Sequence, residues 1–342
     1  MKIKIGNIQN SIIHYSGNKA NGEGVKFSEI ETSLTEVENE FKKIIDSNFS
    51  FDEMFCFNFV SKLELNPIYS FASEIFDSTD CFIAQSQNIV RYLYDQSTHS
   101  RIKGGELYVI LFKDCDLDNK KVNALGLFKT EIKNTFLQVQ PTENGYKIKS
   151  EKGINKLDKG CIIFNEEKSD GYFVAIVDNT NKFEAKYWKD DFLHVAQRQD
   201  SFYQTKNIVS LCKKFLEEEL PQSFDITKVE QAALLNKSIN ILKDNESINI
   251  EKFTQEVFEK PEMIQSFNKY KSNYEEENNI YIEDSFDISE QALRRVAKGS
   301  MNIIKLDKNF DINIHGGEHL LQKGYDNEKK MYYYKFYFVE EK

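Results

Sequence analysis

The spacing of hydrophobic residues divides the chain into extended and helical blocks. Alternating apolar and polar positions over residues 2–15 predict a strand or a bent pair of strands. Over residues 27–44 the apolar side chains instead recur three and four positions apart, which predicts an amphipathic helix. Residues 51–95 predict further helices with a break at Pro67.

A series of short strands follows these helices. The apolar runs are separated only by short segments containing Gly, Asn, Asp or Pro, and they cover residues 106–113, 123–132, 136–140, 145–149, 159–165 and 171–179. Connections of this length leave no room for a crossover helix, so the sheet should be largely antiparallel.

From about residue 200 the pattern is helical again, and it ends in strands. Helices are predicted over residues 208–216, 225–243 and 251–279, with Pro261 as the start of a new helix, and strands over 301–306, 310–315, 320–323 and 331–339. The fold class is therefore α+β: an N-terminal part with a largely antiparallel sheet and flanking helices, a helical middle and short C-terminal β-strands. We predict two domains, an α+β domain over residues 1–198 and a helical domain ending in β-hairpins over residues 199–342.

Composition narrows the class of protein. The chain has 342 residues, of which 40% are hydrophobic, and this is enough to build a sizeable core. Five cysteines without a CxxC pair predict reduced thiols in a cytoplasmic protein. No apolar run approaches the roughly 20 residues of a membrane helix, and the N-terminus has no secretory apolar region, so we expect no membrane contact.

Charge is distributed unevenly along the chain. The net charge is −10, which excludes a uniformly basic protein but not a local basic face that binds an anion. Residues 1–100 carry a net charge of −6 and residues 201–290 one of −8, whereas residues 101–200 carry +1 and residues 291–342 carry +3. Positive potential is therefore expected toward the carboxyl end.

The densest basic cluster comprises Arg294, Arg295 and Lys298, followed by Lys305 and Lys308. Ser289 is a suitable N-cap, so the first three cations should lie in the last turn of a short helix that leads into a hairpin. Such cations stabilise a helix dipole by about 0.3–1 kcal/mol, which is one explanation for them. The functional alternative is contact with DNA phosphates.

Candidate catalytic motifs are weak. The sequence His315-Gly-Gly-Glu318-His319 matches an H-x-x-E-H zinc pattern, but that chemistry requires a helix, and the two glycines here follow a predicted strand. A turn between strands explains the motif better. We predict no catalytic residue, no metal and no cofactor. The aromatic run Tyr332–Phe338 predicts a central or interface strand, and a base-stacking platform is the alternative. We consider this run a candidate dimer interface.

A family resemblance adds to this interpretation. Residues 288–310, together with the strands Gly105–Phe112 and Ala124–Lys129, resemble the bacterial nucleoid-associated protein family, the YejK/NdpA-like group. The resemblance implies association with the nucleoid and no known catalysis. Family members carry a basic segment at the start of the helix after the sheet, and the corresponding residues here are Lys206 with Arg198 upstream.

Three hypotheses follow. The first is a non-catalytic, nucleoid-associated protein that binds DNA with little sequence preference through Arg294, Arg295, Lys298, Lys305, Lys308, Arg198 and Lys206, as a homodimer located in the cytoplasm at the nucleoid. The second is a protein-interaction module whose acidic helical surfaces bind nucleoid or DNA-processing proteins. The third is an enzyme with a site around His315, Glu318 and His319.

Overall fold

The computed structural model describes residues 2–180, 186–297, 303–313 and 320–340. The chain forms two compact units, Met1–Arg198 and Gln199–Lys342. Each unit has its own hydrophobic core.

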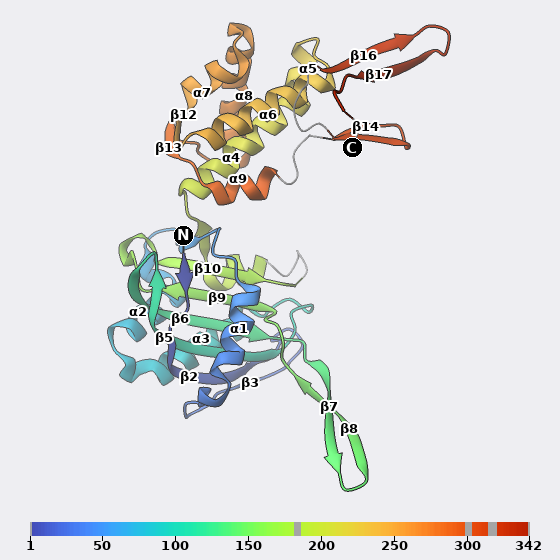
Figure 1. Ribbon diagram of the computed structural model, residues 1–342. Helices are drawn as coiled ribbons and strands as arrows, with labels where there is room; N and C mark the ends of the chain where they lie inside the picture. The colour runs from blue at the N-terminus through green and yellow to red at the C-terminus, as the bar shows by residue number, and fades with distance from the viewer. Residues whose placement is uncertain (1, 181–185, 298–302, 314–319, 341–342) are drawn as a thin grey trace. The chain divides into compact units, whose positions relative to one another are not determined.

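An antiparallel sheet is the centre of the first unit (Figure 1). Within the described residues it has nine strands: β1 Ile3–Lys4, β2 Asn7–Ser16, β3 Val25–Lys26, β4 Phe55–Phe57, β5 Gly105–Leu117, β6 Lys120–Thr130, β9 Lys159–Phe164, β10 Phe173–Asp178 and β11 Val195–Gln197. Their order is β11-β4-β10-β9-β6-β5-β2-β3, and β1 pairs with β5. The alternating apolar side chains of the long strands β5 and β6 supply both faces of the core.

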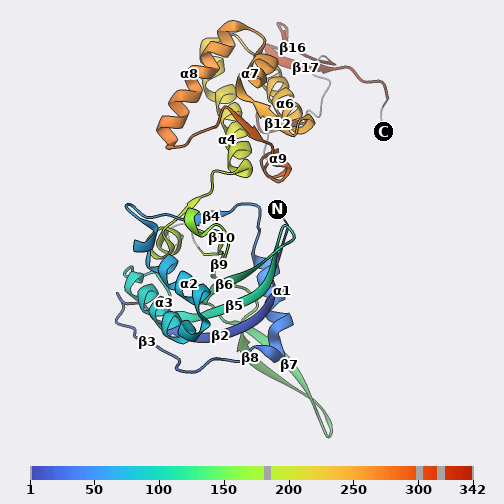
Figure 2. The same ribbon diagram turned by 90° about the vertical axis from the view of Figure 1, so that its left-hand side faces the viewer.

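Helices cover both faces of this sheet (Figure 2). Helix α1 (Glu38–Asn48) buries Phe41 and Ile45 against one face. Helices α2 (Pro67–Asp77) and α3 (Phe82–Gln96) and the π-helix η5 (Tyr187–Leu193) cover the other face, where Trp188 is fully buried. The result is a helix–sheet–helix arrangement.

Two strands leave the sheet. Strands β7 (Asn134–Thr142) and β8 (Gly145–Gly153) pair only with each other, and Figure 1 shows them as a ribbon that projects from the sheet. The sequence pattern predicts both strands, but it places them in the series that builds the sheet. We call residues 134–153 the β7–β8 ribbon.

The second unit is helical. Its helices are α4 Ser201–Lys214, the π-helix η6 Phe215–Glu219, α5 Leu220–Ser223, α6 Lys228–Asp244, α7 Ile250–Phe258, α8 Pro261–Asn278 and α9 Glu290–Ala297. The side chains of Asp200 and Thr227 cap α4 and α6, and Thr227 forms a capping box with Glu230. The short pair β12 (Ser247–Asn249) and β13 (Ser285–Asp287) joins the ends of the helical segments.

Two hairpins follow α9. Strands β14 (Ile303–Leu306) and β15 (Phe310–Asn313) form the first, and β16 (Leu321–Asp326) and β17 (Met331–Phe336) form the second. Leu306, Ile312, Leu321 and Tyr334 pack against Val229 and Ala232 of α6. Both hairpins are thereby attached to the helical core.

The predicted fold class is confirmed: an antiparallel sheet, a helical middle and short C-terminal strands. Pro261 does begin a helix. The helix predicted from residue 27 is wrong in its first part, because α1 begins only at Glu38 and Ile30 is 78% exposed. Residues 28–32 instead run along β2, where the Ser28 Oγ donates to the Ile13 carbonyl and the Thr32 amide donates to the Ser11 carbonyl.

Candidate nucleic-acid interface

The predicted arginines lie on α9. Ser289 caps this helix, because its Oγ accepts a hydrogen bond from the Ala292 amide at 3.3 Å. Ala292 and Leu293 are buried, whereas Arg294 and Arg295 are exposed. The helix therefore presents an apolar face to the core of the second unit and its guanidinium groups to solvent.

Helix α9 packs against α4. The Ser289 amide donates to the Thr205 Oγ1 of α4 at 2.9 Å, and the Glu283 amide donates to the Gln204 side chain at 3.1 Å. Lys206 follows these two contact residues and is half-buried. Lys206 therefore lies on α4, the helix against which α9 packs.

Arg294 forms an exposed ion pair on α9. Its side chain is 78% exposed, and its Nη2 lies 3.0 Å from the Glu290 carboxylate one turn earlier. A pair this exposed contributes little to stability, because water and salt screen it.

Lys305 and Lys308 lie in the first C-terminal hairpin and not on α9 with Arg294 and Arg295. Lys308 is exposed in the turn between β14 and β15, and Lys305 lies on β14 opposite Asp311 in the register. Lys298 lies outside the described residues, as do His315, Glu318 and His319 of the H-x-x-E-H motif. In the described part of the chain, no three His, Cys, Asp or Glu side chains are grouped so that they could hold a metal ion.

Arg198 belongs to the first unit. Its Nη2 lies 2.6 Å from the Glu167 carboxylate, and its guanidinium lies 3.8 Å from the centre of the Phe173 ring. The side chain is only 17% exposed. These contacts connect Arg198 to the segment between β9 and β10 and to β10 itself, so Arg198 has a structural role that its place in the sequence does not reveal.

The β7–β8 ribbon is a candidate surface that the sequence reasoning missed. Residues that face each other across an antiparallel pair share one side of it. One side carries mainly apolar residues: Leu137, Val139, Pro141, Tyr146 and Ile148. The other side carries Phe136 and Glu151 toward the base, followed by Gln138, Gln140, Lys147 and Lys149. The alternation of Tyr146-Lys-Ile-Lys149 indicates a strand with one apolar and one polar side. It does not show that the rest of the unit covers neither side.

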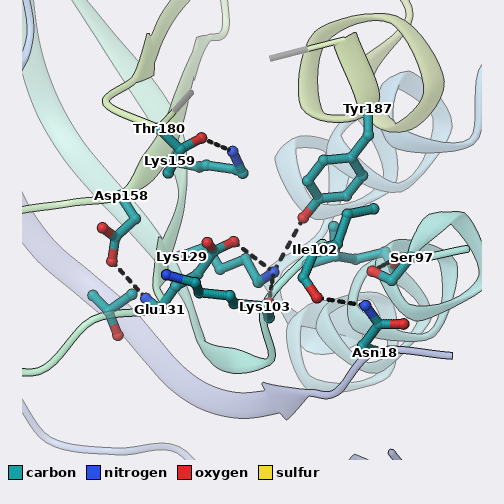
Figure 3. Close-up of polar contacts among 12 residues, drawn as sticks. Asn18, Ser97, Ile102, Lys103, Lys129, Glu131, Asp158, Lys159, Thr180 and Tyr187 are labelled. Atoms are coloured by element: carbon teal, nitrogen blue, oxygen red, sulfur yellow. Dashed lines mark hydrogen bonds and ion pairs between the residues drawn. The ribbon is translucent and has the colours of Figure 1, made fainter. Parts of the chain in front are cut away.

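A buried polar network holds the base of the ribbon (Figure 3). The Lys129 ammonium is fully buried at the end of β6 and donates to the Glu131 carboxylate at 2.8 Å, the Lys103 carbonyl at 2.6 Å and the Tyr187 hydroxyl at 3.1 Å. All three of its protons are therefore used. Burial lowers the pKa of Lys129, and the adjacent Glu131 carboxylate opposes that change.

Asp158 fixes the backbone directly after the end of β6. Its Oδ2 accepts from the amides of Glu131 and Ile132 at 2.6 and 2.9 Å, where the chain leaves the sheet for the ribbon. On the neighbouring strand, Lys159 is also fully buried and pairs with Asp178 at 3.1 Å. The ammonium groups of Lys129 and Lys159 are buried, and both donate to acceptors in the network. These are features of a structural anchor rather than of a catalytic centre.

Comparison with protein families identifies the class. The chain matches a family of nucleoid-associated proteins over residues 12–333, which extends across both units. This family is NA37, nucleoid-associated protein YejK, and the chain belongs to it. The resemblance seen in the sequence is thereby confirmed, and membership implies a location at the nucleoid.

A search of curated proteins found no match. None of the helices in the described ranges is both long enough and apolar enough to cross a membrane.

Proposed function

We propose that this protein is a non-catalytic, nucleoid-associated protein that binds DNA with little sequence preference through phosphate contacts, and that it acts as a dimer. Family membership over residues 12–333 supports the association with the nucleoid. The observation that carries the DNA proposal is the exposure of the α9 guanidinium groups, with Arg294 at 78%.

Electrostatics favours a phosphate at this position. The chain is acidic as a whole, yet residues 291–342 carry a net charge of +3. The Arg294–Glu290 pair is exposed and therefore weak, so a phosphate can replace the carboxylate at little cost. Each phosphate bound in this way also releases condensed counterions, which adds affinity without any sequence preference.

The proposed contacts are the predicted cations: Arg294, Arg295, Lys298, Lys305, Lys308, Lys206 and Arg198. We expect the largest effects from the two arginines of α9, since they are exposed on one short helix. We expect the smallest effect from Arg198, because Glu167 and Phe173 already occupy its guanidinium.

A fluorescence polarisation titration with a random-sequence duplex across a salt series tests the proposal. The wild type should bind at low salt, and the logarithm of its affinity should fall linearly with the logarithm of salt concentration. Arg294→Glu/Arg295→Glu should reduce that slope by about 2, the loss expected for two phosphate contacts.

The matched control is Lys252→Glu/Lys269→Glu. It makes the same change in net charge at exposed positions of α7 and α8. If both double variants weaken binding equally, net charge rather than α9 controls affinity. If the wild type does not bind even at low salt, direct DNA contact is wrong.

The alternative function is recruitment by proteins. Residues 201–290 carry a net charge of −8, and Glu276 and Glu277 are exposed near the end of α8. Such a surface favours basic partners among nucleoid or DNA-processing proteins. Under this alternative, Arg294→Glu/Arg295→Glu leaves nucleoid association in cells intact, whereas under the first proposal it reduces that association.

A further inference from the structure

The β7–β8 ribbon has an apolar face whose exposure to water is unfavourable. Leu137, Val139, Tyr146 and Ile148 lie on this face and are between 59% and 80% exposed. An isolated two-stranded ribbon is only marginally stable in water, and a contiguous exposed apolar surface usually marks an interaction site. The anchored base explains how the ribbon is attached, but it leaves this face open.

We propose that the apolar face of the ribbon binds the same face of a second copy of this chain. The inference rests on the dimer of the proposed function and assigns its interface to the ribbon rather than to the aromatic run Tyr332–Phe338; it does not depend on DNA binding. Two copies related by a twofold axis bring one surface onto itself, so each contact occurs twice. The face must then be complementary to itself when its direction is reversed.

The register satisfies this requirement. Four cross-strand rows follow one another along the face: Thr135/Lys152, Leu137/Ser150, Val139/Ile148 and Pro141/Tyr146. Reversal about the centre places the second row on the third and the first row on the fourth. Leu137 then lies against Val139 of the partner subunit, and the small Ser150 leaves room for Ile148 of the partner subunit.

Charge supports the same arrangement. The cation of this face, Lys152, lies near the base of the ribbon, whereas Glu143 lies in the turn at its tip. Reversed packing brings Lys152 close to Tyr146 and toward Glu143 of the partner subunit, where an aromatic ring and a carboxylate both favour an ammonium group. Lys147 and Lys149 point away on the opposite face, so their like charges stay apart.

The size of the face sets the strength of the dimer. Strands of nine residues extend about 30 Å at roughly 3.3 Å per residue, and a two-stranded ribbon is about 10 Å wide, so each copy contributes roughly 300 Å². A standard interface buries about 800 Å² on each partner. The face is smaller than a standard interface, so we expect a weak dimer whose population depends on protein concentration.

Sedimentation velocity of the full chain without DNA tests the proposal. The mass should rise from that of the 40.0 kDa chain toward twice that value between about 1 and 100 µM protein, the range that corresponds to a weak interface. Val139→Glu/Ile148→Glu places charges at the centre of the face and should keep the protein monomeric over this range. Gln138→Glu/Gln140→Glu adds the same charge to the opposite face and should leave the rise unchanged.

Hydrogen exchange provides a second measurement that needs no variant. The amides of β7 and β8 should become more protected at high protein concentration, while those of β5 and β6 should not change. A wild type that stays monomeric at 100 µM, or an apolar-face variant that still dimerises, overturns the proposal. Ribbon protection that appears only after duplex DNA is added also overturns it, because DNA is then the occupant.

Discussion

The imidazole of His14 lies buried between β2 and α3, with 2% of the residue exposed. Its Nδ1 accepts the Ser28 amide proton at 3.0 Å, so its Nε2 carries the proton and donates to the Ser86 Oγ at 3.0 Å. The Ser86 hydroxyl in turn donates to the Ile83 carbonyl. Burial lowers the pKa of His14 to about 4, because the charged imidazolium would lose its solvation. A proton on Nδ1 would also face the Ser28 N–H group, which donates to that atom.

This network predicts a loss of stability in acid. The unfolded chain binds a proton on His14 near pH 6.5, but the folded chain binds it only near pH 4. The contribution of His14 is therefore complete above pH 6.5 and is lost as the pH falls toward 4, with a total of about 3 kcal/mol. Urea unfolding at pH 7 and pH 4.5 should show a smaller difference in unfolding free energy for His14→Gln than for the wild type. Equal differences would contradict the assignment.

Single residues also show what the sequence could and could not predict about the site. The cap at Ser289 and the exposed arginines of α9 follow from local spacing, and the structure has the cap where the spacing placed it. The ion pair of Arg198 with Glu167 joins residues 31 positions apart, and no local pattern reports it. Arg198 and Lys206 are close in the sequence, but they belong to different units.

Among the elements, the β7–β8 ribbon depends on its buried base. The Lys129–Glu131 pair is almost completely buried, so removal of one partner leaves an uncompensated charge in the core. We expect Lys129→Met to lower the free energy of unfolding by about 3–5 kcal/mol in urea denaturation.

Two controls make this prediction specific. Lys129→Met/Glu131→Leu removes both charges and should recover most of the lost stability, because no unpaired charge remains. Lys133→Met breaks the neighbouring pair with Glu106, in which the lysine is 47% exposed, and should cost less than about 1 kcal/mol. If the single and double variants at Lys129 are equally unstable, the network does not act through charge pairing.

The same elements show the limits of periodicity. The stripe that begins at Phe27 continues in helical register into α1, yet Phe27 lies beside the Arg91 guanidinium at 5.1 Å rather than in a helix. Hydrogen bonds to β2 hold that segment extended, and they depend on tertiary structure. Three-residue strands such as β4 are too short to show a period, and they form because β10 and β11 lie on either side.

At the scale of the whole molecule, each unit has hydrophobic clusters of its own among the described residues. Two clusters lie within residues 1–198, and the other two lie within residues 199–342. Block-wise periodicity could predict where helices replace strands, but it could not show which residues form the core of each unit. Whether each unit is an independent domain remains a prediction.

Expression of the two units as separate fragments tests that prediction and the location of the DNA contacts together. Because each fragment retains its complete clusters, both should unfold cooperatively in urea. The fragment 199–342 contains α9 and both C-terminal hairpins, so it should keep most of the DNA affinity of the full chain and its salt dependence. The fragment 1–198 should bind weakly, since Arg198 is engaged by Glu167. Cooperative unfolding of both fragments with DNA binding only by 1–198 would move the DNA contacts to the first unit, where the lysines of the β7–β8 ribbon would be the next residues to reverse.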